Sequence, residues 1–268
     1  MKIQILTIPF FKYQGAGNDF VMVDDRNRSF SHNPALIRRI CDRHFGIGAD
    51  GLILLQDDAA LDFNMVYFNS DGHPSSMCGN GGRCVVRFAN KLGIIQKETE
   101  FNAIDGSHQA VIDGDLIRLK MSNIPEVISD SGFVFLNTGS PHHVEFVSEL
   151  SQLDVKSLGA QIRHGPPYFE EGTNVNFVEI TGKETLRIRT YERGVEDETL
   201  ACGTGVTAAA IAAFESGLIH SQKVEVKTLG GNLSVEFERN LSGGYENIWL
   251  TGPAEYVFEG ELTIIDKF

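Results

Sequence analysis

Two cysteines open two similar stretches of the chain, and in each stretch glycine stands one and three positions later. The stretches are residues 77–84 (MCGNGGRC) and 201–208 (ACGTGVTA). Each follows a strand-like run and a polar turn, and each leads into an apolar segment that ends at a glycine fifteen residues beyond its cysteine, Gly93 or Gly217. This pattern predicts a cysteine in the first turn of a helix, where backbone N–H groups and the helix dipole favour the thiolate.

Two such cysteines on opposite faces of one carbon suit racemisation or epimerisation. One thiolate would remove an α-proton, and the other group, as a thiol, would return a proton from the far side. Gly79 and Gly203 would let a ligand approach the backbone at the two helix starts, where N–H groups hold a carboxylate.

The similarity extends over both halves of the chain. Four landmarks recur in one order, at an offset of 122 for Gly17 and Gly139 and of 124 for the others: Gly48 and Gly172, Cys78 and Cys202, Gly93 and Gly217. We therefore predict two similarly folded halves, residues 1–125 and 126–268, with an active-site cleft between them. Two tandem domains with unrelated sites are the alternative.

Many short strand-like runs and few helices predict an α+β fold rather than a doubly wound parallel sheet. We expect strands at 3–8, 20–24, 52–55, 63–68, 133–136, 175–180, 186–191, 223–237 and 246–259. Helices are expected from Asn33 towards His44, from Cys78 to Gly93, around 150–158 and after Cys202. The polar stretch 122–132 is expected to link the halves.

Composition excludes several classes of protein. A net charge of -13 and a pI near 5.0 argue against a nucleic-acid surface. The first thirteen residues lack the features of a signal peptide, and no apolar run is long enough for a membrane span. We therefore expect a cytoplasmic protein with no nucleic-acid or membrane partner.

The four cysteines contain no C-x-x-C pair, which argues against a zinc ribbon or a thioredoxin-type site. We expect no bound metal, and we expect Cys41 and Cys84 to be buried, reduced thiols.

Further motifs add a resemblance to a known family. Together with the two cysteine stretches, the segments GAGNDF, YFNSDG, TNVNF, YERG and LTGPAE resemble diaminopimelate epimerase from about residue 12 to residue 260. The related proline racemases carry a histidine where Asn80 stands, and PhzF-like relatives generally lack the cysteine pair. The resemblance implies a cofactor-independent homodimeric enzyme that interconverts LL- and meso-diaminopimelate for lysine and peptidoglycan synthesis.

The resemblance also implies roles for individual residues. Cys78 and Cys202 match the acid/base pair, and His142 and Glu192 match supporting polar residues. The side chains that match the substrate-recognising set are Asn18, Asn69, Asn174, Glu192 and Arg193, and the turns on the reacting carboxylate are Gly79-Asn80 and Gly203-Thr204. One departure is Ser140, which stands where the Gly-Asn-Pro-His turn of the family has a ligand-contacting asparagine.

Simpler interpretations stay open. The three asparagines could bond their own turns, Glu192 and Arg193 could be a surface pair, and His142 could be structural. Three functions compete: the epimerase, an isomerase or racemase of the same fold acting on another small amino acid, and a non-catalytic or redox-sensing dithiol protein. Arg193 and the asparagines favour a substrate with a second amino-acid end over proline.

Overall fold

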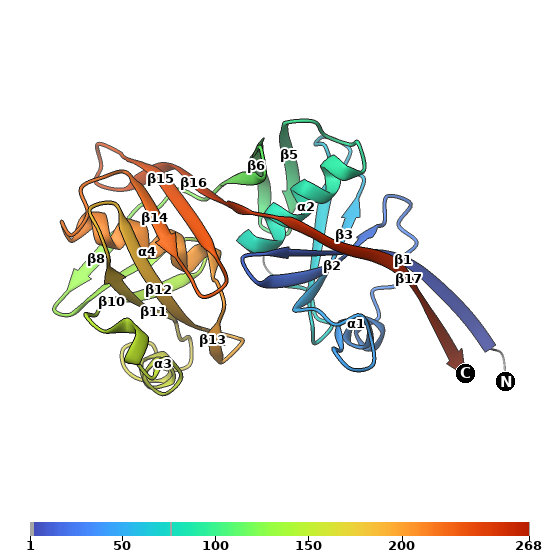
Figure 1. The fold of residues 1–268 in the computed structure, drawn as a ribbon, viewed down its shortest axis with the longest axis horizontal. Coiled ribbons are helices and arrows are strands. Elements are labelled where there is room, and N and C mark those ends of the chain that lie inside the picture. The colour runs from blue at the N-terminus through green and yellow to red at the C-terminus, as the bar shows by residue number, and fades with distance from the viewer. Residues whose placement is uncertain (1–2, 76, 268) are drawn as a thin grey trace. The chain divides into compact units, whose positions relative to one another are not determined.

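The computed structural model describes residues 3–75 and 77–267, whose helices and strands are drawn in Figure 1. These residues divide into two compact units. Unit 1 takes the described residues up to Ile117 and from Ala254 onward, and unit 2 is Arg118–Pro253. Strand β7 (Leu116–Lys120) crosses the division.

The sheet of unit 1 has the strand order β17-β1-β2-β3-β4-β5-β6. Its β2–β3 and β4–β5 pairs are parallel and the other pairs are antiparallel. Helices α1 (Pro34–Cys41) and α2 (Gly79–Lys91) provide the crossovers that parallel pairs require. The strands are β1 (Ile3–Gly15), β2 (Asn18–Asp24), β3 (Gly51–Gln56), β4 (Asn64–Asn69), β5 (Glu98–Ala103), β6 (Gly106–Asp113) and β17 (Glu255–Lys267).

The sheet of unit 2 has the order β8-β9-β10-β11-β12-β14-β15-β16, again with two parallel pairs, β10–β11 and β12–β14. Its crossovers contain α3 (Val155–His164), which follows the 3-10 turn η1 (Leu150–Gln152), and α4 (Gly203–Glu215). The strands are β8 (Val127–Asp130), β9 (Phe133–Asn137), β10 (Pro141–Phe146), β11 (Asn174–Ile180), β12 (Thr185–Glu192), β13 (Asp197–Thr199), β14 (Lys223–Lys227), β15 (Asn232–Arg239) and β16 (Tyr245–Pro253).

The two units therefore share one topology, with β17, β1, β2 and β3 of unit 1 matching β8, β9, β10 and β11 of unit 2. In both units an antiparallel hairpin (β1–β2 or β9–β10) is followed in the sheet by a parallel pair, an antiparallel pair and a second parallel pair. The predicted α+β fold with two similar halves is confirmed.

Helices cover both faces of the sheet in unit 1. Leu52 and Leu54 of β3 pack into the cluster that contains Ile37 and Ile40 of α1. Ile53, between them, lies against Gly81 of α2 on the opposite face. Because successive side chains of a strand point to opposite faces, a strand covered on both sides is apolar throughout, which explains the continuous run at 52–55.

The two cysteine helices end in the same way. In α2 the N–H of Gly93 donates to the Asn90 carbonyl and the N–H of Ile94 to the Ala89 carbonyl, both at 3.0 Å. Gly93 has φ 73°, a left-handed conformation that favours glycine at this position. The end of α4 repeats these bonds at Gly217 (φ 68°) and Leu218, so both predicted helix stops are confirmed.

The division of the chain differs from the expected domains 1–125 and 126–268. β17 pairs with β1 from Ile3↔Lys267 to Gln14↔Glu255, so the end of the chain belongs to unit 1. There it takes the place beside β1 that β8 takes beside β9. The stretch 122–132, expected to be a linker, contains β8 and is part of unit 2.

Other elements also differ in extent. The runs expected at 223–237 and 246–259 each divide into two strands, and the helix expected towards His44 ends at Cys41. The first strand, expected at 3–8, continues to Gly15 because its second half pairs with β2. The helix expected around 150–158 is instead η1 followed by α3, whose N-cap Asp154 accepts a hydrogen bond from the Ser157 N–H. Over residues 3–75 and 77–267, no helix has the length and apolar character needed to cross a membrane.

Candidate active site

Cys78 and Cys202 occupy equivalent places, the N-cap positions of α2 and α4. Each carbonyl accepts the first helical hydrogen bond, from Gly82 at 2.7 Å and from Val206 at 2.9 Å. Both residues have extended backbone, and neither side chain caps its own helix. The cysteines thus lie one residue before the predicted first turn, beside N–H groups that have no intrahelical acceptor.

Unit 1 brings four of the predicted residues together at Cys78. The Cys78 Sγ lies 3.6 Å from the Asn18 Oδ1, and the Asn80 Nδ2 lies 3.5 Å from the same oxygen. The fully buried Arg83 donates to the Asn80 Oδ1 at 2.8 Å and to the Gly79 carbonyl at 3.2 Å. The helix start is therefore fixed by a buried cation.

A network of charged side chains holds the Asn18 side chain in place. Its Nδ2 donates to the Asp50 Oδ2 at 2.5 Å, and Arg43 binds Asp50 and Asp19, each at 2.8 Å. Lys12 lies 2.7 Å from Asp19. Burial alone would raise the pKa of Asp19, but hydrogen bonds from Arg43 and Lys12 outweigh it and lower the pKa to about 2.

In unit 2 two hydroxyl groups lie at the helix start that carries Cys202. The Thr204 Oγ1 lies 3.3 Å from the Cys202 Sγ, and the Thr138 hydroxyl donates to the Thr204 carbonyl at 3.0 Å. A Cβ atom at Gly205 would come within 3.4 Å of both the Cys202 Cβ and the His142 Cε1. It would also lie 2.5 Å from the Asn176 Oδ1, so only glycine fits.

His142 is fully buried beside this helix start. Its Nδ1 lies 3.1 Å from the Asn176 Nδ2, which also donates to the His143 carbonyl at 3.0 Å. Burial, assisted by the charge of Arg193, lowers the pKa of His142 to about 3. The imidazole is therefore neutral at physiological pH, and among the described residues its Nε2 has no hydrogen-bond partner.

Asn174 joins two further predicted positions. Its Nδ2 donates to the Ser140 Oγ at 2.5 Å and to the Pro141 carbonyl at 3.0 Å, and its Oδ1 accepts the Arg193 N–H at 2.9 Å. Arg193 also donates from its side chain to the Glu171 carbonyl at 2.8 Å. Ser140 thus keeps a hydrogen-bonding role despite its departure from the family motif.

Two further predicted residues, Glu192 and Asn69, differ from each other in their surroundings. Glu192, half-buried at the end of β12, accepts a hydrogen bond from the Thr199 hydroxyl at 3.1 Å. Asn69 is exposed at the end of β4, where its N–H donates to the His73 carbonyl at 3.0 Å. The backbone of Asn69 thus belongs to the turn after β4, whereas the side chains of Asn18 and Asn174 bond other residues.

The other two cysteines are buried free thiols, as predicted. Burial raises the pKa of both Cys41 and Cys84 to about 12, so both stay protonated.

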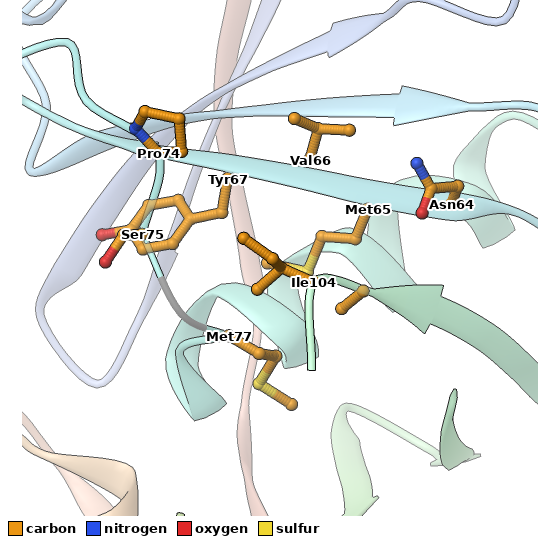
Figure 2. A pocket seen from close by; sticks show the side chains of 9 residues that line it. Asn64, Met65, Val66, Tyr67, Pro74, Ser75, Met77 and Ile104 are labelled. Atoms are coloured by element: carbon orange, nitrogen blue, oxygen red, sulfur yellow. The ribbon is translucent and has the colours of Figure 1, made fainter. Parts of the chain in front are cut away.

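A pocket of about 200 Å³ opens beside β4 in unit 1 (Figure 2). Met65, Tyr67, Met77 and Ile104 give it a largely apolar lining, and Met77 directly precedes Cys78. None of the residues predicted from the sequence lines this pocket.

The sequence prediction missed three residues that hold the predicted ones: Asp50, Arg83 and Asn176. A signal existed for two of them. Asp50 falls on Asn174 at the offset of 124 found for Gly48 and Gly172. Asn176 stands two positions after Asn174, hence on the same face of β11.

Comparison with known proteins agrees with these observations. The family model described as diaminopimelate epimerase matches residues 10–115 and 134–257. The chain is similar to the diaminopimelate epimerase of Flavobacterium psychrophilum, with 56% identity over 93% of this chain and 98% of that protein. Its similarity to the diaminopimelate epimerase of Chlorobaculum tepidum is 45% identity over 93% and 99%.

Solved structures share the fold at low sequence identity. A PhzF-family phenazine biosynthesis protein of Bacillus anthracis has a TM-score of 0.75 at 14% identity, covering 97% of this chain and 100% of that one. A hydroxyproline epimerase of Agrobacterium vitis has a TM-score of 0.69 at 14% identity, covering 97% and 93%.

Proposed function

Because the chain belongs to the diaminopimelate epimerase family, we propose that it interconverts LL- and meso-2,6-diaminopimelate with Cys78 and Cys202 as its acid/base pair. The observation that carries this proposal is the duplicated helix start, in which each unit presents a cysteine at the N-cap and a glycine as the first helical residue. An inversion in which different groups act on the two faces of one carbon needs two such groups.

The proposed mechanism exchanges one proton for another. One cysteine, as thiolate, takes the proton from the α-carbon, whose electron pair delocalises into the attached carboxylate. The other cysteine, as thiol, gives its proton to the opposite face, so that each turnover inverts the centre and swaps the protonation states of the two sulfurs. The mechanism requires both thiols to reach the same carbon.

The helix starts would stabilise the charge that develops during the reaction. The N–H groups of Gly79-Asn80 and Gly203-Thr204 stand at the positive ends of α2 and α4, where a carboxylate is bound best. As the carbanion forms, negative charge grows on this carboxylate, so the same N–H groups bind the transition state more strongly than the substrate.

His142 and Glu192 would support the pair without taking the proton from carbon. With Nδ1 accepting from Asn176, the neutral imidazole carries its proton on Nε2 and can donate it to an anionic partner without adding positive charge. Glu192 would supply a negative charge on the side of the substrate away from His142.

Recognition of the far end of diaminopimelate requires partners for an ammonium and a carboxylate. We assign the carboxylate to Arg193, whose planar guanidinium matches it, and the ammonium to Glu192. Asn18, Asn69 and Asn174 would orient the remaining polar atoms.

We further propose a cofactor-independent cytoplasmic homodimer that serves lysine and peptidoglycan precursor synthesis. The support for a dimer is a run of three consecutive large apolar side chains on β17, Tyr256, Val257 and Phe258, which are 44%, 50% and 43% exposed. Sedimentation equilibrium of the wild type and of Val257→Glu tests this. A monomeric wild type would contradict it.

The reaction is tested with purified protein that has been treated with a chelator and supplied with LL-diaminopimelate alone. Chiral chromatography should show the meso isomer, and the same equilibrium mixture should form from either isomer. No interconversion, or interconversion only after pyridoxal phosphate or a metal ion is added, would contradict the proposal.

A further inference from the structure

We propose that Asp50 is a positioning residue that fixes the side-chain amide of Asn18, so that Cys78 is the protonated partner in the free enzyme and Cys202 is the base. This inference rests on the proposed acid–base role of the two cysteines. It starts from the contact between the Asn18 Nδ2 and the Asp50 Oδ2, which are 2.5 Å apart.

The first step is the orientation of the amide. A carboxylate only accepts hydrogen bonds, so the nitrogen of the Asn18 amide must face Asp50. Asp50 is itself held by Arg43 at 2.8 Å and by the backbone N–H of Asp19 at 3.2 Å. Turning the amide over would place two oxygens against each other, and Asp50 therefore allows one orientation of Asn18.

The second step is the effect of that orientation on Cys78. The Asn18 oxygen faces the Cys78 Sγ at 3.6 Å and is held in place by the Asn80 Nδ2 at 3.5 Å. A thiol can donate to this oxygen, whereas a thiolate would face its lone pairs. The contact therefore favours the protonated form of Cys78.

The third step is that unit 2 contains the same pair with the opposite polarity. At the repeat offsets of 122 and 124, Asn18 corresponds to Ser140 and Asp50 to Asn174. Here the second residue donates: the Asn174 Nδ2 lies 2.5 Å from the Ser140 Oγ. No carboxylate is present in this pair, and the hydroxyl beside Cys202, on Thr204 at 3.3 Å, can donate to a thiolate.

Charged and titratable groups around α2 act on Cys78 as well. The buried guanidinium of Arg83 favours the thiolate and so opposes the effect of Asn18. Other titratable groups of this region are the Cys84 thiol on α2, Tyr13 on β1 and Glu255 on β17. The carboxylate of Asp19, with the cations of Arg43 and Lys12, completes the set. A test must therefore separate the orientation of Asn18 from a general change in charge.

The test is the pH dependence of alkylation by iodoacetamide without substrate, with each cysteine followed by peptide mass mapping. In Asp50→Asn residue 50 no longer only accepts, because its own amide nitrogen can face Asn18; the Asn18 amide can then turn its Nδ2 to the sulfur, opposed only by the 3.5 Å contact with Asn80. We expect the apparent pKa of Cys78 to fall by about one unit, which gives about tenfold more thiolate at pH values below it. The profile of Cys202 should not change.

Two controls isolate the cause. Asp19→Asn removes a carboxylate from the same network but leaves the Asn18–Asp50 contact, so it should shift Cys78 much less. In an Asn18→Ala background, Asp50→Asn should have no further effect on Cys78. If Asp50→Asn does not fold, Asn18→Ala alone decides, because removal of the oxygen must lower the apparent pKa of Cys78.

An unchanged Cys78 profile in Asp50→Asn, a shift that persists in the Asn18→Ala background, or an equal shift of Cys202 would overturn the proposal. Alkylation needs no turnover, so its result is independent of the proposed reaction. Failure of wild-type protein to epimerise diaminopimelate would refute the proposed function while the alkylation profiles still report on Asp50.

Discussion

The Asn176 Nδ2 lies 3.1 Å from the His142 Nδ1 and, because an amide nitrogen only donates, Nδ1 is the acceptor of this bond. A neutral His142 therefore carries its proton on Nε2. The Asn176 oxygen is held by the Thr190 hydroxyl at 3.0 Å, so the orientation of this amide is fixed from the side opposite the imidazole. One buried amide thus sets the tautomer beside Cys202.

Burial of neutral His142 makes stability depend on pH. With its folded pKa lowered to about 3, the folded state binds no proton between pH 6.5 and 3, whereas the unfolded state does. The contribution of this group to the free energy of unfolding is therefore fully present above pH 6.5. As the pH is lowered from 6.5 towards 3, it decreases by up to ~1.4 kcal/mol per pH unit. We expect His142→Gln to lose less stability than wild type between pH 7 and 5 in urea unfolding. The same replacement at exposed His44 is the control, and parallel curves for wild type and His142→Gln would contradict the assignment.

Replacement of either N-cap cysteine should abolish epimerisation. Cys78→Ala and Cys202→Ala each remove one of two groups that have no substitute, so kcat should fall at least ~100-fold. Circular dichroism should show an intact fold for both variants. Cys84→Ala is the matched control, since this buried thiol stays protonated and its loss should leave activity near the wild-type value. More than a few per cent of activity in either N-cap variant would contradict the pairing.

Mild oxidation should inactivate the enzyme reversibly. Two thiols that reach the same carbon can form a disulfide after local movement, and reduction with dithiothreitol should restore activity. Peptide mapping of the inactive form should find Cys78 linked to Cys202. A link that involves Cys41 or Cys84, or no link at all, would count against the proposed site.

Arg193 should decide the choice of substrate. Arg193, exposed in the free protein, would become buried against bound substrate, so Arg193→Met, which removes the proposed partner of the distal carboxylate, should lower kcat/KM for diaminopimelate by about a thousandfold. Arg187→Met is the control, because Arg187 pairs with Glu179 on exposed strand surface. Wild-type protein should barely act on lysine or proline, and comparable turnover of either would refute the substrate assignment.

Much of this fold follows from local sequence signals. Gly93 and Gly217 end their helices because the left-handed conformation there favours glycine, and the continuous apolar run at 52–55 marks a strand covered on both faces. The start of α3 was also readable, since Asp154 is an ordinary N-cap residue, yet the apolar residues at 150 and 153 led to an earlier helix start.

What could not be predicted depends on contacts between distant residues. The return of β17 to β1 joins Ile3 to Lys267, and no local pattern reports such a pairing. The same holds in the candidate site. Asp50 fixes the orientation of the Asn18 amide from thirty-two residues further along the chain. Asn176 fixes the tautomer of His142 from thirty-four residues further along. Sequence indicated the residues that we propose meet the substrate more readily than the residues that hold them in place.

The most direct test of the two-cysteine mechanism is the location of deuterium early in a reaction run in heavy water. If one thiolate removes the proton and a second thiol returns one, newly formed meso-diaminopimelate carries one solvent deuterium at the inverted carbon. LL-diaminopimelate recovered at the same time stays unlabelled, because its face of the carbon meets only the thiolate that takes the proton. Mass spectrometry of the two separated isomers should give this result. Deuterium entering the recovered substrate as fast as the product would show one group acting on both faces and would contradict the mechanism.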